Sequence, residues 1–377
     1  MDAQLPPPTD LLSTIRSSCA TLTAKSGITI DPANIDEYIL SMPQDDWKRE
    51  SGPEKHGVRL PLVFDSVEEE LNVLGTLALL NFLSGYRHAL HRLTGRGAFS
   101  TMEMLVLSAY ISSSDNPDSS ILSARGMRQA TVAQLADLAR IETHVEKAHP
   151  TLGSAVKVGE KDEEAFEILG LLAGVLKETS EVLDRLGNRS IGAWLLEKLG
   201  DAEGDGPKLV RDLASTFPSF RDVHLVDDQP IFILKKALWL VTVVSLAFGT
   251  REPSEVPFKV PNISSFPVFA DNVLPTLLIH HGILDLSASS DPALRSLTLS
   301  NPSSLSLSSA SATRIRAASI VACSDVVSRA HELATETGKE WLASWTEQEL
   351  DGWLWNEGKW ADRRDIERIS EKGTVYY

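Results

Sequence analysis

Apolar residues recur along this 377-residue sequence at the spacing of helices, and no stretch shows sustained alternation of apolar and polar residues. Helical spacing gathers apolar side chains on one face of a helix, whereas strict alternation is typical of a half-buried strand. Hydrophobic residues make up 42% of the chain, which is enough for a substantial core. The sequence therefore predicts a mainly α fold, built as a single large helical domain.

We expect the proline-rich residues 1–10 to form a flexible N-terminus and residues 11–377 to form the helical domain. Within this domain, residues 287–311 are rich in serine and are predicted to be mobile. Residues 44–58 are expected to be a polar loop. The predicted helices cover residues 11–24, 35–42, 71–83, 101–111, 121–126, 130–147, 162–186, 189–199, 208–217, a segment that is capped by 227–230 and runs to 248, and 312–335.

The formal net charge of −16 argues against broad binding to nucleic acids or anionic membranes. An anionic small substrate would therefore need a local basic pocket. Two cysteines, Cys19 and Cys323, are too few for a disulfide framework and fit a reducing compartment. The longest apolar run, 237–248, is too short to cross a bilayer, and the start of the sequence has no signal-peptide pattern. We expect a cytoplasmic protein with no membrane partner.

Two acidic residues each follow an aromatic segment, in Phe217-Pro-Ser-Phe-Arg-Asp222 and Phe266-Pro-Val-Phe-Ala-Asp271. A buried helix is expected after the second segment, with Asn272 as its N-cap and Gly282 at its end. Hydrolysis of an N-glycosidic bond passes through a cationic sugar that a carboxylate can stabilise, while aromatic rings can stack on the base. We therefore hypothesise that both acids converge on one dry cavity lined by rings.

The alternative interpretation of the two acids is structural. Asp222 could pair with Arg221 or cap a turn, and Asp271 could simply start a helix. From the pattern alone, this structural interpretation is favoured.

Several cations could hold an anionic group. Lys235 and Lys236 begin an otherwise apolar helix, where they could form a phosphate site or could extend to solvent at the helix end. Arg87 opens the densest basic stretch, which runs to Arg96. In the predicted helix 312–335, Arg314 and Arg316 are placed on the polar side. Since no cysteine or acidic residue stands at ligand spacing from the histidines, we expect no metal site.

In their order along the chain, these motifs make the sequence resemble the queuosine salvage family of queuosine 5′-phosphate N-glycosylases, in particular its fungal branch. The matching stretches are Leu80-Asn-Phe-Leu-Ser-Gly-Tyr-Arg87, Gly95-Arg-Gly-Ala98, Phe217–Asp222, Lys235-Lys-Ala237, Phe269-Ala-Asp-Asn-Val-Leu-Pro275 with His281-Gly282, Thr313-Arg-Ile-Arg-Ala317, and the C-terminal Trp353-Leu-Trp355, Asp362-Arg and Val375-Tyr. The resemblance covers the chain from about residue 56 onward.

The resemblance implies a fold similar to helical DNA glycosylases and the hydrolysis of queuosine 5′-phosphate to queuine and ribose 5-phosphate, without a metal or another cofactor. Its partner would be a small nucleotide, with no direct contact to nucleic acid. Asp222 would be the nucleophile or the group that stabilises the transition state. The queuine site would be formed by Ser219, Phe220, Asp271, Asn272, Thr276 and an N-terminal histidine that corresponds to His56.

The 5′-phosphate is expected at Lys235, Lys236 or Arg87. Many members of the family have tyrosine, arginine and glutamine where this chain has Asn272, Val273 and Thr276, and glutamine where it has Leu238. Two alternatives therefore stay open. The chain could act on or bind a related nucleotide or base, or it could be a helical binding protein without catalysis.

Overall fold

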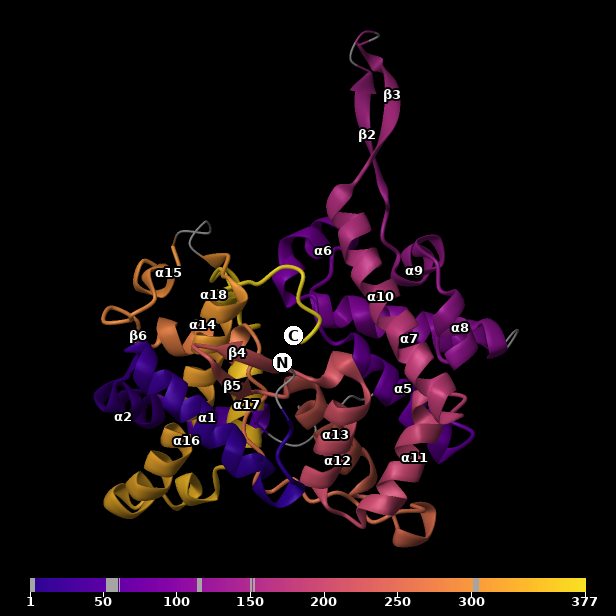
Figure 1. Cartoon of the computed structure of the whole chain (residues 1–377). Coiled ribbons are helices and arrows are strands. Elements are labelled where there is room, and N and C mark those ends of the chain that lie inside the picture. Colours follow the sequence, from indigo (N-terminus) through magenta and orange to yellow (C-terminus); the bar gives the residue numbers. More distant parts are fainter. Residues whose placement is uncertain are drawn as a thin grey trace.

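The computed structural model describes residues 4–51, 60, 62–113, 117–149, 151, 153–300 and 305–377 (Figure 1). Helices dominate these residues, which confirms the predicted mainly α fold. The helices are α1 Pro8–Ser26, α2 Pro32–Ser41, α3 Gln44–Glu50, α5 Val67–Leu80, α6 Arg87–Thr94, α7 Ala98–Ser113, α8 Ala124–Gln129, α9 Val132–Ala139, α10 Glu163–Leu186, α11 Ile191–Ala202, α12 Gly206–Thr216, α13 Lys235–Phe248, α14 Val273–His280, α15 Pro292–Arg295, α16 Ser309–Thr337, α17 Glu347–Glu357 and α18 Ala361–Arg364. Among the described residues no helix combines the length and apolar character needed to cross a bilayer.

In the part of the chain that the structure describes, three antiparallel strand pairs lie between the helices. They are β1 Thr29–Ile30 with β6 Leu284–Asp285, β2 His144–His149 with β3 Gly153–Lys161, and β4 Val223–Val226 with β5 Gln229–Phe232. The likeness to helical DNA glycosylases stays a prediction.

Two groups of helices make up the molecule (Figure 1). One contains the middle of the sequence, where α5 packs against α11 and α13, and α10 packs against α8 and α9. In the other, the long helix α16 lies along α1 and also contacts α2, α14 and α17. Helix α1 contacts α12 and β5 as well, so the two groups share one core. Strand β4, which contacts α16, therefore lies where the groups meet.

Short side chains cap several helix starts. Ser66 accepts a hydrogen bond from the Glu69 amide at 3.1 Å, although Glu69 reaches back to the Asp65 amide rather than to Ser66. Asp162 caps α10 by accepting from the Ala165 amide at 3.0 Å.

The predicted helix cap at 227–230 is wrong, because 227–228 form the turn of a β hairpin and 229–230 begin β5. Asp227 and Asp228 both have positive φ, 50° and 59°. Two consecutive residues of this kind make the turn that suits the twist of paired strands, and aspartate tolerates it. Strands β4 and β5 pair on either side, and α13 begins only at Lys235.

The predicted helix over 130–147 is also wrong beyond Ala139. The chain continues into β2 and β3, which project from the body of the molecule (Figure 1). Charged pairs such as Lys157 and Glu146, 2.8 Å apart, bridge the two strands, and the described side chains of β3 are exposed. Since neither face is buried, the hairpin lacks the alternating pattern by which strands are recognised.

Three segments expected to be irregular contain ordered structure. Residues 44–50 form α3, whose Trp47 stacks on Trp345 with ring centroids 3.7 Å apart. Helix α1 begins at Pro8, three residues early, and Leu5 is buried. In the serine-rich stretch, α15 forms and Ser308 caps α16 by accepting from the Ser311 amide at 3.2 Å. The mobility of 1–10 and 287–311, and the division of the chain at residue 10, stay predictions.

Candidate functional site

Asp222 is buried at the meeting point of the two helix groups, with an exposed fraction of 1%. Asp222 lies between the 3-10 turn Pro218–Phe220 and the start of β4. Two nitrogens of Arg316 lie 3.1 and 2.7 Å from its two carboxylate oxygens. His224 Nε2 lies 2.8 Å from Oδ1, and the Lys235 amide donates to Oδ2 at 3.2 Å. The carboxylate therefore has a donor for each of its acceptor positions.

Arg316 makes hydrogen bonds to both of the segments that end in an acid. Its side chain is 1% exposed, its Nε donates to the Ala270 carbonyl at 2.8 Å, and its guanidinium lies 3.9 Å from the centre of the Tyr377 ring. The prediction that Arg316 lies on a polar helix face is wrong, because α16 packs between α1 and α14 and this face is interior. The partner of Asp222 is thus Arg316 rather than the adjacent Arg221.

The Asp222 carboxyl stays ionised in this setting. Burial alone would raise its pKa, because it disfavours the charged form. The positive charge of Arg316 and the hydrogen bonds from His224 and Arg316 outweigh burial and hold the pKa of Asp222 well below its usual range.

Lys235 and Lys236 both carry their ammonium groups into the protein, so neither extends to solvent. Lys235 Nζ donates to the Asn81 carbonyl at 3.0 Å, and Lys236 Nζ donates to the Leu79 carbonyl at 2.8 Å. Burial lowers the pKa of Lys235 to about 8, against the opposing effect of the nearby Asp271 charge. Burial and the neighbouring Lys235 charge lower the pKa of Lys236 further. Both amino groups therefore lie near Asp222, and that of Lys235 also lies near Asp271.

Asp271 is half-buried and caps α14. Its Oδ1 accepts from the amides of Val273 at 2.7 Å and Leu274 at 3.4 Å. Asn272 stands at the predicted N-cap position of α14, but its side chain makes no capping hydrogen bond. The Asn272 amide group instead donates to the carbonyls of Ser84 and Ile369, at 3.4 and 3.2 Å.

The other predicted site residues occupy several places. Thr276 is buried and its hydroxyl donates to the Asn272 carbonyl at 2.6 Å. Ser219 donates to Glu178 at 3.2 Å, and the buried Phe220 ring lies 5.5 Å from Lys236 Nζ. Arg87 is held by the Arg364 and Ile366 carbonyls, at 2.6 and 3.4 Å. His56 lies outside the described residues.

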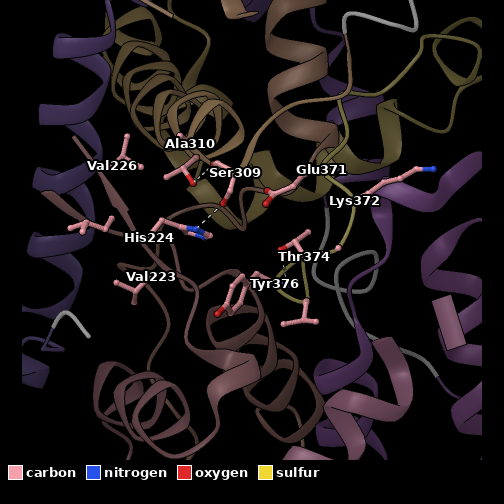
Figure 2. A pocket seen from close by; sticks show the side chains of 13 residues that line it. Val223, His224, Val226, Ser309, Ala310, Glu371, Lys372, Thr374 and Tyr376 are labelled. Atoms are coloured by element: carbon pink, nitrogen blue, oxygen red, sulfur yellow. Dashed lines mark hydrogen bonds between the residues drawn. The ribbon is translucent and has the colours of Figure 1, made fainter. Parts of the chain in front are cut away.

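A pocket of about 740 Å³ opens beside Asp222 (Figure 2). Its walls are β4, the first turn of α16 and the C-terminal strap, which we define as residues 371–377 and of which 371–376 line the pocket. Neither Asp222 nor Asp271 lines it, so it is not the cavity that we expected between the two acids. His224 does line it, and its Nδ1 lies 3.4 Å from Ser309 Oγ.

Sequence reasoning missed three residues of this site, namely His224, Arg316 and Tyr377. His224 stands two residues after Asp222, a spacing that puts both side chains on one side of an extended segment. Arg316 lies in one of the motifs that carry the family resemblance, but its burial was not visible in the sequence.

Residues 102–377 match the model of the family described as queuosine salvage protein. No curated protein gives a significant match to the chain.

Proposed function

The chain belongs to the queuosine salvage protein family and so has a role in queuosine salvage; from this premise we propose that it is a metal-independent N-glycosyl hydrolase. It cleaves queuosine 5′-phosphate, in the cytoplasm, to queuine and ribose 5-phosphate. The queuine is then available for tRNA modification.

The observation that carries this proposal is the buried, ionised Asp222. Queuine is a 7-deazaguanine and has no N7 that an acid could protonate. Departure of the base therefore depends on stabilising the positive charge that develops on the ribose. Asp222 supplies the negative charge, and Arg316 keeps it ionised. The bond between C1′ and the base nitrogen breaks with its electron pair on the base. Water then gives its oxygen to C1′ and, in total, one proton to the base.

Asp271 is assigned to the base. Its Oδ1 already accepts two helix amides, so Oδ2 is the oxygen that we assign to the ring N–H and exocyclic amine of queuine. Ser219, Phe220, Asn272, Thr276 and His56 complete the queuine site in this proposal.

The 5′-phosphate is assigned to Lys235, with Lys236 and Arg87 as further candidates. The Lys235 ammonium is buried and is hydrogen-bonded to a carbonyl rather than to a carboxylate, so its charge is available to an anion. It also begins α13 directly beside Asp222. A local cation of this kind would let a protein of net charge −16 bind an anionic substrate.

The test is hydrolysis of queuosine 5′-phosphate by the full chain, with and without a chelator, followed by mass-spectrometric identification of both products. We expect queuine and ribose 5-phosphate in either condition. Because Asp222→Asn leaves Arg316 unpaired and could unfold the protein, the double variant Asp222→Asn/Arg316→Gln is tested beside it. Asp201→Asn, which loses only a surface pair with Lys198, is the control.

Parent-like turnover by the folded double variant would contradict the role of Asp222. Absence of turnover by the parent chain would contradict the hydrolase.

One observation favours a second candidate. Every acceptor position of Asp222 is occupied, as expected for a structural ion pair in a binding protein without catalysis. Such a protein would be stabilised against heat by queuine or a related base and would release nothing from the nucleotide. A panel of nucleotides and free bases, assayed for melting temperature and for base release, separates the two functions.

A further inference from the structure

Asp222 has no free position from which to contact a molecule in the adjoining pocket. An ionised carboxylate offers about four acceptor positions. Arg316 fills two, and His224 and the Lys235 amide fill the others. The side chain is 1% exposed and does not line the pocket. Asp222 therefore cannot hydrogen-bond a pocket ligand directly, and apart from the effect of its charge it acts on such a ligand through one of these partners.

His224 is the partner that reaches the pocket. Its side chain is 11% exposed, and its two ring nitrogens face opposite ways. Nε2 lies 2.8 Å from Asp222 Oδ1, while Nδ1 faces Ser309 Oγ at 3.4 Å. Figure 2 shows His224 and Ser309 pointing toward each other, with Tyr376 nearby. The Tyr376 ring meets the imidazole edge-on, with centroids 5.4 Å apart.

The charge of Asp222 decides which nitrogen of a neutral His224 carries the proton. A carboxylate accepts hydrogen bonds, so Nε2 must be the N–H and Nδ1 must carry the lone pair. The same logic holds the histidine of a catalytic triad in one tautomer. The basic nitrogen of His224 is thus directed at the pocket, and the acid behind it stabilises the imidazolium that forms on protonation.

We propose that His224 is the general base of the hydrolysis, an inference that rests on the proposed function. His224 Nδ1 takes a proton from a water molecule in the pocket as the water oxygen bonds to C1′ of the ribose. The C1′–nitrogen bond breaks and its electron pair leaves with the base, which takes a proton from solvent. The imidazolium returns its proton to solvent, so the step balances as the addition of one water.

Ser309 raises an alternative, in which its hydroxyl rather than water attacks C1′. A hydroxyl, a histidine and an acid in this order can form a serine nucleophile that is activated by the histidine. Its Oγ lies at the long end of hydrogen-bond distances from Nδ1, and Ser309 is exposed at the pocket wall. Water can occupy the same place. Ser309→Ala therefore separates a serine nucleophile from an activated water.

The experiment measures kcat and KM of the full chain on queuosine 5′-phosphate for the parent, His224→Ala, His224→Asn, Ser309→Ala and the control Asp201→Asn. General-base catalysis contributes about 10²- to 10⁴-fold. We expect a loss of this size in kcat for both His224 variants, with little change in KM. Asn can still donate to Asp222, so His224→Asn should keep the parent melting temperature. Added imidazole should restore part of the activity of His224→Ala, whereas Ser309→Ala should stay within about tenfold of the parent.

Three results would overturn the inference. Parent-like turnover by His224→Asn would show that no base is needed at this position. A loss in His224→Ala that imidazole does not restore would show a merely structural role. A loss in Ser309→Ala equal to that in His224→Ala would assign the nucleophile to serine. In all three the parent still releases queuine, so the proposed function survives; a parent without turnover would overturn both.

Discussion

The segments that end at Asp222 and Asp271 are alike in sequence and differ in how their acids are held. Both place phenylalanines and a proline ahead of an aspartate. Asp222 is bonded chiefly by Arg316, which is distant in the chain, and also by the nearby His224. Asp271 accepts from two amides at the start of its own helix. One acid is therefore held by tertiary structure and the other by local structure.

An aromatic segment that ends in an acid therefore does not by itself determine the role of that acid. A local cap such as Asp271 can be predicted from neighbouring residues. A buried ion pair such as that of Asp222 depends on a partner that reaches it only in the folded chain. Substitutions at four positions test this difference between the two acids.

The largest effect is expected for Asp222→Asn. At the sequence level this change removes charge and keeps shape, but in the structure it leaves the buried Arg316 guanidinium without a counter-charge. Breaking a buried pair in this way costs about 3–5 kcal/mol. We therefore expect that drop in the free energy of unfolding by urea denaturation, together with loss of turnover. Equal stability of Asp222→Asn and Asp271→Asn would contradict the difference between the two segments.

The ammonium of Lys235 interacts with the charges of both acids. Its titration should make the free energy of unfolding depend on pH. Its pKa is about 8 in the folded chain, below the value of 10.5 for a free lysine. Between these two values the unfolded chain binds more protons, so stability rises with pH. Lys235→Met should remove a rise of roughly 3 kcal/mol between pH 8 and pH 10.5. Urea unfolding of both proteins across this range provides the check, and identical pH profiles would refute it.

Arg316→Lys should sharpen the role of the ion pair. Lysine keeps the charge but lacks the planar fork that bonds both oxygens of Asp222, and it cannot also reach the Ala270 carbonyl. We expect a loss of about 1.5–3 kcal/mol in the free energy of unfolding, the range for hydrogen bonds to charged groups. Turnover should fall as well. If Arg316→Lys has the same free energy of unfolding as the parent, the positive charge at this position is sufficient and the two-oxygen contact with Asp222 adds no stability.

The smallest effect on stability is expected at Asp271. Asparagine caps a helix about as well as aspartate, so Asp271→Asn should leave the free energy of unfolding nearly unchanged, whereas Asp271→Ala should cost about 1 kcal/mol. Both should weaken queuine binding by about tenfold or more, because the base loses a charged acceptor. Calorimetric titration with queuine measures this. Unchanged affinity in both variants would remove Asp271 from the base site.

The sequence predicted most helices because their caps and apolar spacing are local. Helix α10 begins at Glu163 and ends at Leu186, almost as expected from 162–186. The hairpin of β2 and β3 was missed because its strands are exposed and carry no apolar face. The turn at Asp227 and Asp228 was taken for a helix cap because aspartate suits both places, and only the positive φ of both residues separates them.

The candidate site was predictable only in part. The acids and the two lysines stand out in the sequence because charge is costly next to apolar runs. Arg316 does not stand out, because its helix also carries other polar residues and its buried face depends on packing against α1 and α14. His224 is separated from Asp222 by one residue, yet its position at a pocket depends on α16 and the C-terminal strap.

The stacking of Tyr377 on Arg316 has a consequence for biosynthesis. Asp222 leaves the ribosome long before Arg316 is translated, and Arg316 long before Tyr377. Contacts between residues so distant in the chain form late, after much conformational entropy has been lost. Until then Asp222 lacks its arginine partner, and helix α1 lacks the surface of α16 against which it packs. Chaperone holding during translation would protect these surfaces until the chain has been synthesised through residue 377.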